Sequence, residues 1–213
     1  RDRMKPYYDN YCFSENKLAD CMFNSDMVLY CMKSLILHGV KPKEIVDPNI
    51  RTDFNKLAYL VRLDHGLGEN FSVIKEIAEQ GEIVTEIVTH FSALEMTDVG
   101  NFKSLLFYFG LLSIKGVDMM GRPILHIPNL VVREQLFNFL IQGYARHDIF
   151  KLDVNRLRTL FENMSFKGDW KPLFEFLAEA IREQSRIREY IEGEAHIKGF
   201  LLAYLSMFRY YQL

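Results

Sequence analysis

The chain has 213 residues, of which 49% are hydrophobic and 14% aromatic, a composition that supports a packed core and argues against intrinsic disorder. Its formal net charge of −2 argues against a generally basic nucleic-acid-binding protein, although a local basic patch remains compatible with it. The length fits one large or two small domains.

Three cysteines lie near the N-terminus, without a CxxC pair: Cys12, Cys21 and Cys31. We interpret them as free thiols of a reducing compartment rather than as a zinc site. No signal peptide is evident, and the most apolar run, 199–213, is too short to cross a bilayer. We therefore expect a cytoplasmic protein with no membrane partner. Because the chain starts with Arg1 and stops within an apolar helical pattern, we also expect a fragment or a shortened relative of something longer.

The first predicted helix ends at His38-Gly39, and Asn24 or Ser25 can cap its start. A second helix is predicted to start at Thr52 or Asp53, and residues 65–70 form a turn. A short helix follows over 72–80 and ends at Gly81. The β-branched run 83–90 favours a strand or a buried segment.

The central stretch, 97–144, predicts a helix, a β-hairpin and a second helix. Four apolar residues recur at helical spacing on one face: Phe102, Leu105, Leu106 and Phe109. Thr97 or Asp98 can cap this helix through a side-chain oxygen, and Gly110 can end it in a left-handed conformation.

Two strands, 111–114 and 122–127, are predicted to follow, joined by a loop over 116–121. We expect Gly116 or Gly121 to take positive φ in that loop. Pro128 ends the second strand, and Asn129 can cap the next helix. A helix that leads into a two-stranded ribbon is typical of the wing end of a winged-helix domain.

After Tyr144 the pattern is purely helical. Asp153 can cap a helix over 154–164, and Pro172 suits the first turn of a long amphipathic helix that reaches residue 191. Gly193 precedes a last helix over 194–211. The predicted fold class is mainly α with a small β component, a winged-helix-like helix–hairpin–helix unit flanked by helical segments. The most plausible domain boundary lies near 146–151.

Four blocks of sequence resemble one bacterial group of proteins. They are YDNYCF at 8–13 with NSD at 24–26, NFKSLLFYFGLLSI at 101–114, IPNLVVRE at 127–134, and GDWKP at 168–172 continuing to EGE at 192–194 and FLL at 200–202. The group consists of large cytoplasmic proteins that carry an N-terminal AAA-type P-loop ATPase domain and a C-terminal PD-(D/E)XK nuclease-like domain. The resemblance covers essentially the whole chain, but it rests on core and turn residues.

The resemblance implies a division of the chain into three parts. Residues 1–50 would be the C-terminal remnant of an ATPase-like module, 51–148 a winged-helix-like domain, and 149–213 a helical segment leading into a truncated nuclease-like domain. ATP and Mg²⁺ are implied for the full-length family only, because this sequence contains no GxxxxGK[ST] string that could cradle phosphates. The implied partners are an upstream ATPase domain and a downstream nuclease-like domain.

By position relative to FLL at 200–202, Glu194 matches the helical metal-binding Glu of the resembled nuclease core. The Asp and the E-x-K motif of such a core would lie beyond residue 213, and a single carboxylate does not complete a metal site. The simpler interpretation of Glu194 is a residue favoured by the helix dipole near an N-terminus.

Three cations could serve nucleic-acid binding by the predicted winged-helix unit: Lys103 on its recognition helix, and Lys115 and Arg122 on its wing. The predicted recognition helix itself carries only one cation, which is few for phosphate contacts. We therefore expect a non-catalytic regulatory and interaction region of an ATPase–nuclease-like protein. The alternatives are a part of a metal-dependent nuclease that needs residues beyond 213, and a nucleic-acid-binding winged-helix module.

Overall fold

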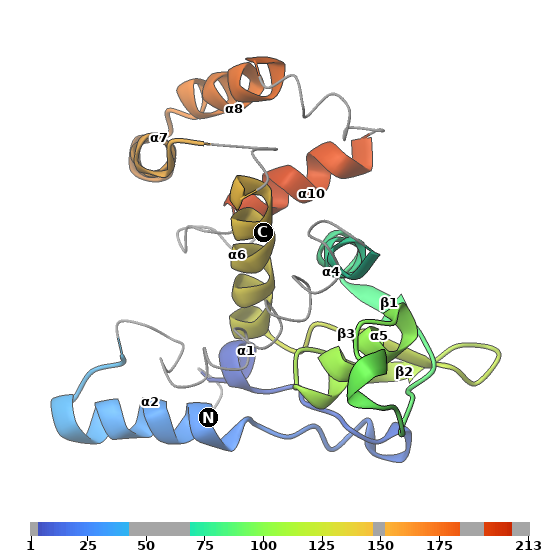
Figure 1. Cartoon of the computed structure of the whole chain (residues 1–213). Coiled ribbons are helices and arrows are strands. Elements are labelled where there is room, and N and C mark those ends of the chain that lie inside the picture. The colour runs from blue at the N-terminus through green and yellow to red at the C-terminus, as the bar shows by residue number, and fades with distance from the viewer. Residues whose placement is uncertain (1–3, 43–68, 147–151, 184–193, 206–213) are drawn as a thin grey trace. The chain divides into compact units, whose positions relative to one another are not determined.

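The computed structural model describes residues 4–42, 69–146, 152–183 and 194–205, and its elements are labelled in Figure 1. The described chain is mainly helical with one small antiparallel sheet, which confirms the predicted fold class at that level. It forms two compact units, Arg1–Leu136 and Phe137–Leu213. The boundary between them falls within helix α6 (Leu130–Arg146).

Several sequence predictions lie outside the described residues. They are the helix start at Thr52 or Asp53, the turn at 65–68, the boundary region 147–151, the extension of the amphipathic helix over 184–191 and the end of the last helix over 206–211. The assignment of three domains remains a prediction.

The N-terminal unit opens with the short helix α1 (Lys5–Tyr8), the 3-10 turn η1 (Glu15–Lys17) and the longer helix α2 (Ser25–His38). Asn24 caps α2, because its side-chain oxygen accepts the Met27 N–H at 3.1 Å. Gly39 ends α2 with φ of 68°. Both ends of this helix confirm the sequence prediction. A buried cluster joins α1 and α2 to the first turn of α6: Tyr8, Met27, Cys31 and Val131.

Helix α4 (Glu69–Gln80) begins earlier than the predicted start at Ser72, so the predicted turn was wrong for its last two residues. Three apolar side chains at helical spacing form its buried face: Phe71, Ile74 and Ile77. Gly81 follows with φ of 80°, as expected for a helix end.

The strand predicted over 83–90 was too long. Strand β1 (Glu82–Val84) pairs with only three residues of its neighbour, and Thr85 adds one more bond, from its N–H to the Pro123 oxygen at 3.2 Å. Beyond that point the β-branched residues have no strand partner, so their propensity alone does not extend the sheet.

The sheet has three strands in the order β1-β3-β2, with β3 (Pro123–His126) in the centre and both neighbours antiparallel to it. Strand β2 (Ser113–Val117) starts later than the predicted 111–114, because the Leu111 and Leu112 N–H groups both bond to the Leu106 oxygen and continue the helix terminus. The register shifts between Ile114 and Gly116, which makes a β-bulge at Lys115.

Helix α5 (Val99–Tyr108) packs its predicted apolar face into the core, with Phe102 and Leu106 fully buried. Asp98 occupies the N-cap position, but its side chain makes no capping bond, so the predicted mechanism was wrong there. The capping box lies one turn earlier, where Ser92 and Glu95 close the 3-10 turn η2 (Ala93–Glu95).

Two other residues predicted to end or cap a helix in this region are confirmed. Gly110 takes φ of 71° after α5. Asn129 caps α6, because its side-chain oxygen accepts the Val132 N–H at 3.1 Å.

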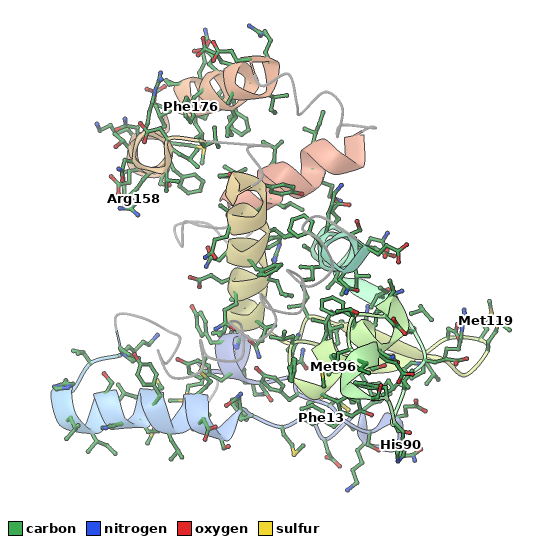
Figure 2. The ribbon with its side chains drawn as sticks, viewed as in Figure 1. Phe13, His90, Met96, Met119, Arg158 and Phe176 are labelled. Atoms are coloured by element: carbon green, nitrogen blue, oxygen red, sulfur yellow. The ribbon has the colours of Figure 1, made fainter. Side chains whose placement is uncertain are left out.

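The C-terminal unit contains α7 (Val154–Lys167), α8 (Lys171–Glu183) and α10 (Glu194–Leu205). Asp153 caps α7 as predicted, and the helix runs past the expected end at 164 to Gly168. Helices α7 and α8 pack through four buried side chains: Leu157, Phe161, Leu173 and Leu177. Arg158 on α7 and Phe176 on α8 are labelled in Figure 2. Within the described ranges, no helix is long and apolar enough to cross a membrane.

Candidate interaction surface at the hairpin tip

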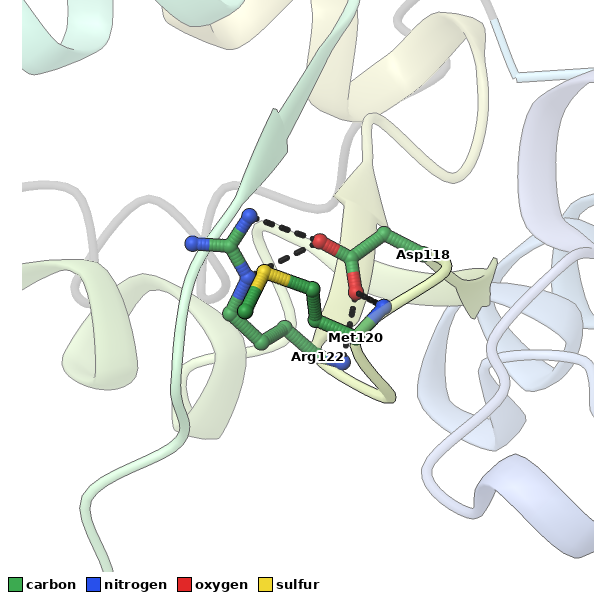
Figure 3. Close-up of polar contacts among 3 residues, drawn as sticks. All are labelled: Asp118, Met120 and Arg122. Atoms are coloured by element: carbon green, nitrogen blue, oxygen red, sulfur yellow. Dashed lines mark hydrogen bonds and ion pairs between the residues drawn. The ribbon is translucent and has the colours of Figure 1, made fainter.

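The turn between β2 and β3 is organised by one carboxylate, that of Asp118 (Figure 3). Its Oδ1 accepts the N–H groups of Met120 at 2.9 Å and Arg122 at 2.8 Å. The Gly121 N–H donates to the Asp118 backbone oxygen at 3.0 Å, and the Asp118 N–H donates to the Arg122 oxygen at 2.9 Å. Two bonds to the Asp118 side chain and two backbone bonds therefore hold residues 118–122 in one conformation.

The same carboxylate binds the guanidinium of Arg122. Its Oδ2 lies 2.8 Å from Arg122 Nε and 2.7 Å from a terminal nitrogen. The Arg122 N–H holds the pKa of Asp118 below its usual value, with further contributions from the Arg122 side chain and the Met120 N–H, and with burial opposing them. The cation predicted to contact phosphate is thus compensated within the turn.

Lys115, the second predicted cation, lies at the bulge of β2 and forms an ion pair with Glu82 on β1. The two strands flank β3, so this pair reaches across the central strand, where His126 lies between its neighbours Glu82 and Ser113. Burial lowers the pKa of His126 below 6.5, Lys115 lowers it further, and Glu82 opposes both effects.

The third predicted cation lies on the helix before the hairpin, as the sequence predicted. Lys103 lies on α5, where its side chain is half-buried. The structure therefore places Lys115 and Arg122 on one hairpin, each beside a carboxylate, and Lys103 on the preceding helix.

Glu194 is the first residue of α10, and its side chain lies outside the described part of the structure. Its role as a metal ligand remains a prediction. Among the residues whose side chains are described, no group of three or more His, Cys, Asp or Glu could hold a metal ion.

The end of the hairpin presents two methionines to solvent, which we call the methionine tip: Met119 and Met120. Met119 is fully exposed and Met120 is 80% exposed. Figure 2 shows Met119 at the outer end of the β2–β3 hairpin. Sequence reasoning missed this surface, although two adjacent methionines in a Gly-bounded loop are a visible signal for it.

A scan against protein-family models and searches of curated proteins and solved structures find no match to the chain. An inference about function therefore depends on the chain's own residues.

Proposed function

We propose that the chain is a non-catalytic interaction region, and that the methionine tip docks onto an apolar surface of another domain of the same ATPase–nuclease-like protein. The observation that carries the proposal is the contrast within one hairpin. Its two cations are compensated by Asp118 and Glu82, while its two methionines are exposed. Protein surfaces, rather than phosphates, are complementary to such a tip.

The winged-helix-like assignment belongs to the same proposal. The order α4, β1, η2, α5, β2, β3, with β3 central in the sheet, supports the assignment, because a helix leads into a two-stranded ribbon there. In a DNA-binding member the wing and the recognition helix need free cations to contact phosphates. Here the wing cations are engaged by carboxylates, so we assign the wing to protein contact.

Methionine suits a docking tip for physical reasons. Its unbranched, polarisable side chain adapts to an irregular apolar pocket. The turn that carries it is already ordered by Asp118, so docking orders side chains but little backbone.

Methionine oxidation by dilute hydrogen peroxide tests the proposal. In the isolated 213-residue chain, Met119 and Met120 should be oxidised faster than the other methionines that the structure describes, because their side chains are more exposed. In the natural gene product with its flanking domains, their oxidation should slow at least about threefold if a pocket covers them. Met22, which is 55% exposed and lies on another segment, is the internal control and should keep its rate. Equal rates at the methionine tip in both proteins would overturn the proposal.

Duplex DNA distinguishes the nucleic-acid alternative. We expect no binding by the isolated chain at low salt. Binding with a steep salt dependence that weakens in both Lys115→Ala and Arg122→Ala would replace the docking proposal with a DNA-contacting wing.

The nuclease alternative predicts a different result. Mg²⁺- or Mn²⁺-dependent DNA cleavage that Glu194→Gln abolishes would show that this region contributes to a nuclease site. The non-catalytic proposal predicts no cleavage by the isolated chain.

A further inference from the structure

The segment before η1 and the segment after it run antiparallel and meet at Tyr11 and Met22. The two residues exchange both backbone hydrogen bonds, from the Tyr11 N–H to the Met22 oxygen at 3.1 Å and from the Met22 N–H to the Tyr11 oxygen at 2.9 Å. They are therefore a hydrogen-bonded antiparallel pair. Continuing the same antiparallel register by one residue brings Cys12 opposite Cys21, at a non-hydrogen-bonded position.

That position suits a disulfide. Residues facing each other at a non-hydrogen-bonded site have Cα atoms about 4.5 Å apart. A disulfide requires a Cα separation of about 4.4–6.8 Å. Cys12 also contributes to the raised pKa of the Cys21 thiol, which indicates that the two side chains lie close together.

Both thiols point into the same short loop. The Cys12 thiol donates to the oxygens of Ser14 at 3.2 Å and Lys17 at 3.5 Å, and the Cys21 thiol donates to the Leu18 oxygen at 3.4 Å. Cys12 is buried, whereas Cys21 is partly accessible. A small oxidant therefore reaches Cys21 first.

The backbone of Cys12 is tied to the sheet. Its N–H donates to Ser113 Oγ at 2.7 Å, and its oxygen accepts the Ile114 N–H at 2.9 Å. A covalent bond from Cys12 to Cys21 would fasten residues 12–21 to the start of β2.

We propose that Cys12 and Cys21 form a reversible disulfide that locks residues 12–21 against β2 when the chain meets an oxidising low-molecular-weight disulfide such as oxidised glutathione. The Cys21 thiolate attacks one glutathione sulfur, releases the first reduced glutathione and forms a mixed disulfide. The Cys12 thiolate then attacks the Cys21 sulfur and releases the second. The protein loses two protons and two electrons, and one small disulfide becomes two thiols.

The reaction accelerates with increasing pH. Burial raises the pKa of the Cys21 thiol above its ordinary value, and Cys12, Asp9 and Asp20 raise it further. Because the thiolate is the nucleophile, the fraction of reactive Cys21 grows as the pH approaches that raised pKa.

Thiol counting by mass spectrometry tests the proposal, with Cys31 as an internal control. Cys31 lies in a separate buried cluster whose other core members are Tyr8, Met27 and Val131. The reduced chain, unfolded and alkylated, should carry three labels, since it has three cysteines. After oxidised glutathione at mildly alkaline pH, only Cys31 should be labelled, and dithiothreitol should restore all three labels. Trypsin cuts after Lys17, so the bond should join peptide 4–17 to peptide 18–33, which holds both Cys21 and Cys31. Fragmentation of the linked peptides should therefore place the alkyl label on Cys31 and the bond at Cys21.

Three single substitutions test which two cysteines form the disulfide. Cys31→Ser should still lose both remaining labels on oxidation. Cys12→Ser and Cys21→Ser should each stop at a glutathione adduct or stay unmodified. Because Cys12 is buried, Cys21→Ser keeps the test valid even where Cys12→Ser fails to fold. A stable glutathione adduct on wild-type Cys21, a bond to Cys31, or three labels after prolonged oxidation would overturn the disulfide.

The locking is tested by thermal unfolding. The oxidised chain should melt several degrees above the reduced chain, because the bond restricts the unfolded chain. The Cys31→Ser variant should show the same upward shift. An unchanged or lower melting temperature with the bond formed would overturn the locking.

Discussion

At Gly121 the backbone takes φ of 78°, in the left-handed region, whereas Gly116 does not take positive φ. A Cβ built at either glycine meets no heavy atom within 4 Å, so the two sites differ in backbone conformation rather than in space. We expect Gly121→Val to lower the free energy of unfolding by more than ~1 kcal/mol, because a β-branched residue fits this region badly. Gly121→Ala should cost more than the matched Gly116→Ala. Urea denaturation measures all three, and equal costs for the two alanine variants would show that the turn conformation is wrong.

A second prediction at this scale concerns His126. Its pKa in the folded chain is lowered below 6.5, chiefly by burial, so the unfolded chain binds the proton more readily. The free energy of unfolding should therefore fall as the pH falls from about 6.5 through the folded-state pKa. His126→Asn should flatten this part of the pH profile. Urea midpoints from about pH 8 to about pH 5 measure the effect, and a wild-type stability that rises on acidification in this window would contradict it.

At the scale of elements, one buried hydroxyl makes two of the hydrogen bonds between the N-terminal segment and β2. Ser113 Oγ accepts the Cys12 N–H at 2.7 Å and donates to the Asn10 oxygen at 2.8 Å. Ser113→Ala should leave the buried Cys12 N–H and the part-buried Asn10 carbonyl without that partner and cost about 1–3 kcal/mol. Ser14→Ala, at a position without a side-chain capping bond, is the control and should change stability by no more than about 0.5 kcal/mol. Equal effects of the two substitutions in denaturant unfolding would show that this hydroxyl does not hold the segment.

The predictable elements were those fixed by neighbours in sequence. Asn24, Asn129 and Asp153 cap helices through N–H groups two or three residues away, so the sequence alone identifies them. The pairing of β1 with β3 joins segments about forty residues apart. The β-propensity of a segment does not show which other segment it will pair with. The same limit applied to the candidate site. The Asp118–Arg122 pair is only four residues apart, a signal that the sequence analysis did not use, and the Lys115–Glu82 pair forms only in the folded sheet.

The same distinction extends to the whole molecule. The net charge of −2 does not show which cations and carboxylates form pairs. The sequence alone indicated a mildly basic hairpin, whereas in the structure each of its two cations pairs with a carboxylate. The spacing of apolar residues was more informative than the net charge, because the face of α5 that it predicted is the face buried in the structure. A chain of modest charge and large apolar content is consistent with a region that works through protein contacts, as proposed for the methionine tip.

The division into two compact units predicts two separable cooperative regions. Phe161 is buried in the packing of α7 and α8, and Leu125 is fully buried in the central strand β3. Phe161→Ala should cost about 3–5 kcal/mol, chiefly as faster amide hydrogen exchange in α7 and α8, with slow exchange kept in β2 and β3. Leu125→Ala should give the opposite pattern, at a cost of about 2–5 kcal/mol. Native-state hydrogen exchange resolves both, and an equal loss of protection in the two units after either substitution would mean that the chain unfolds as one cooperative body.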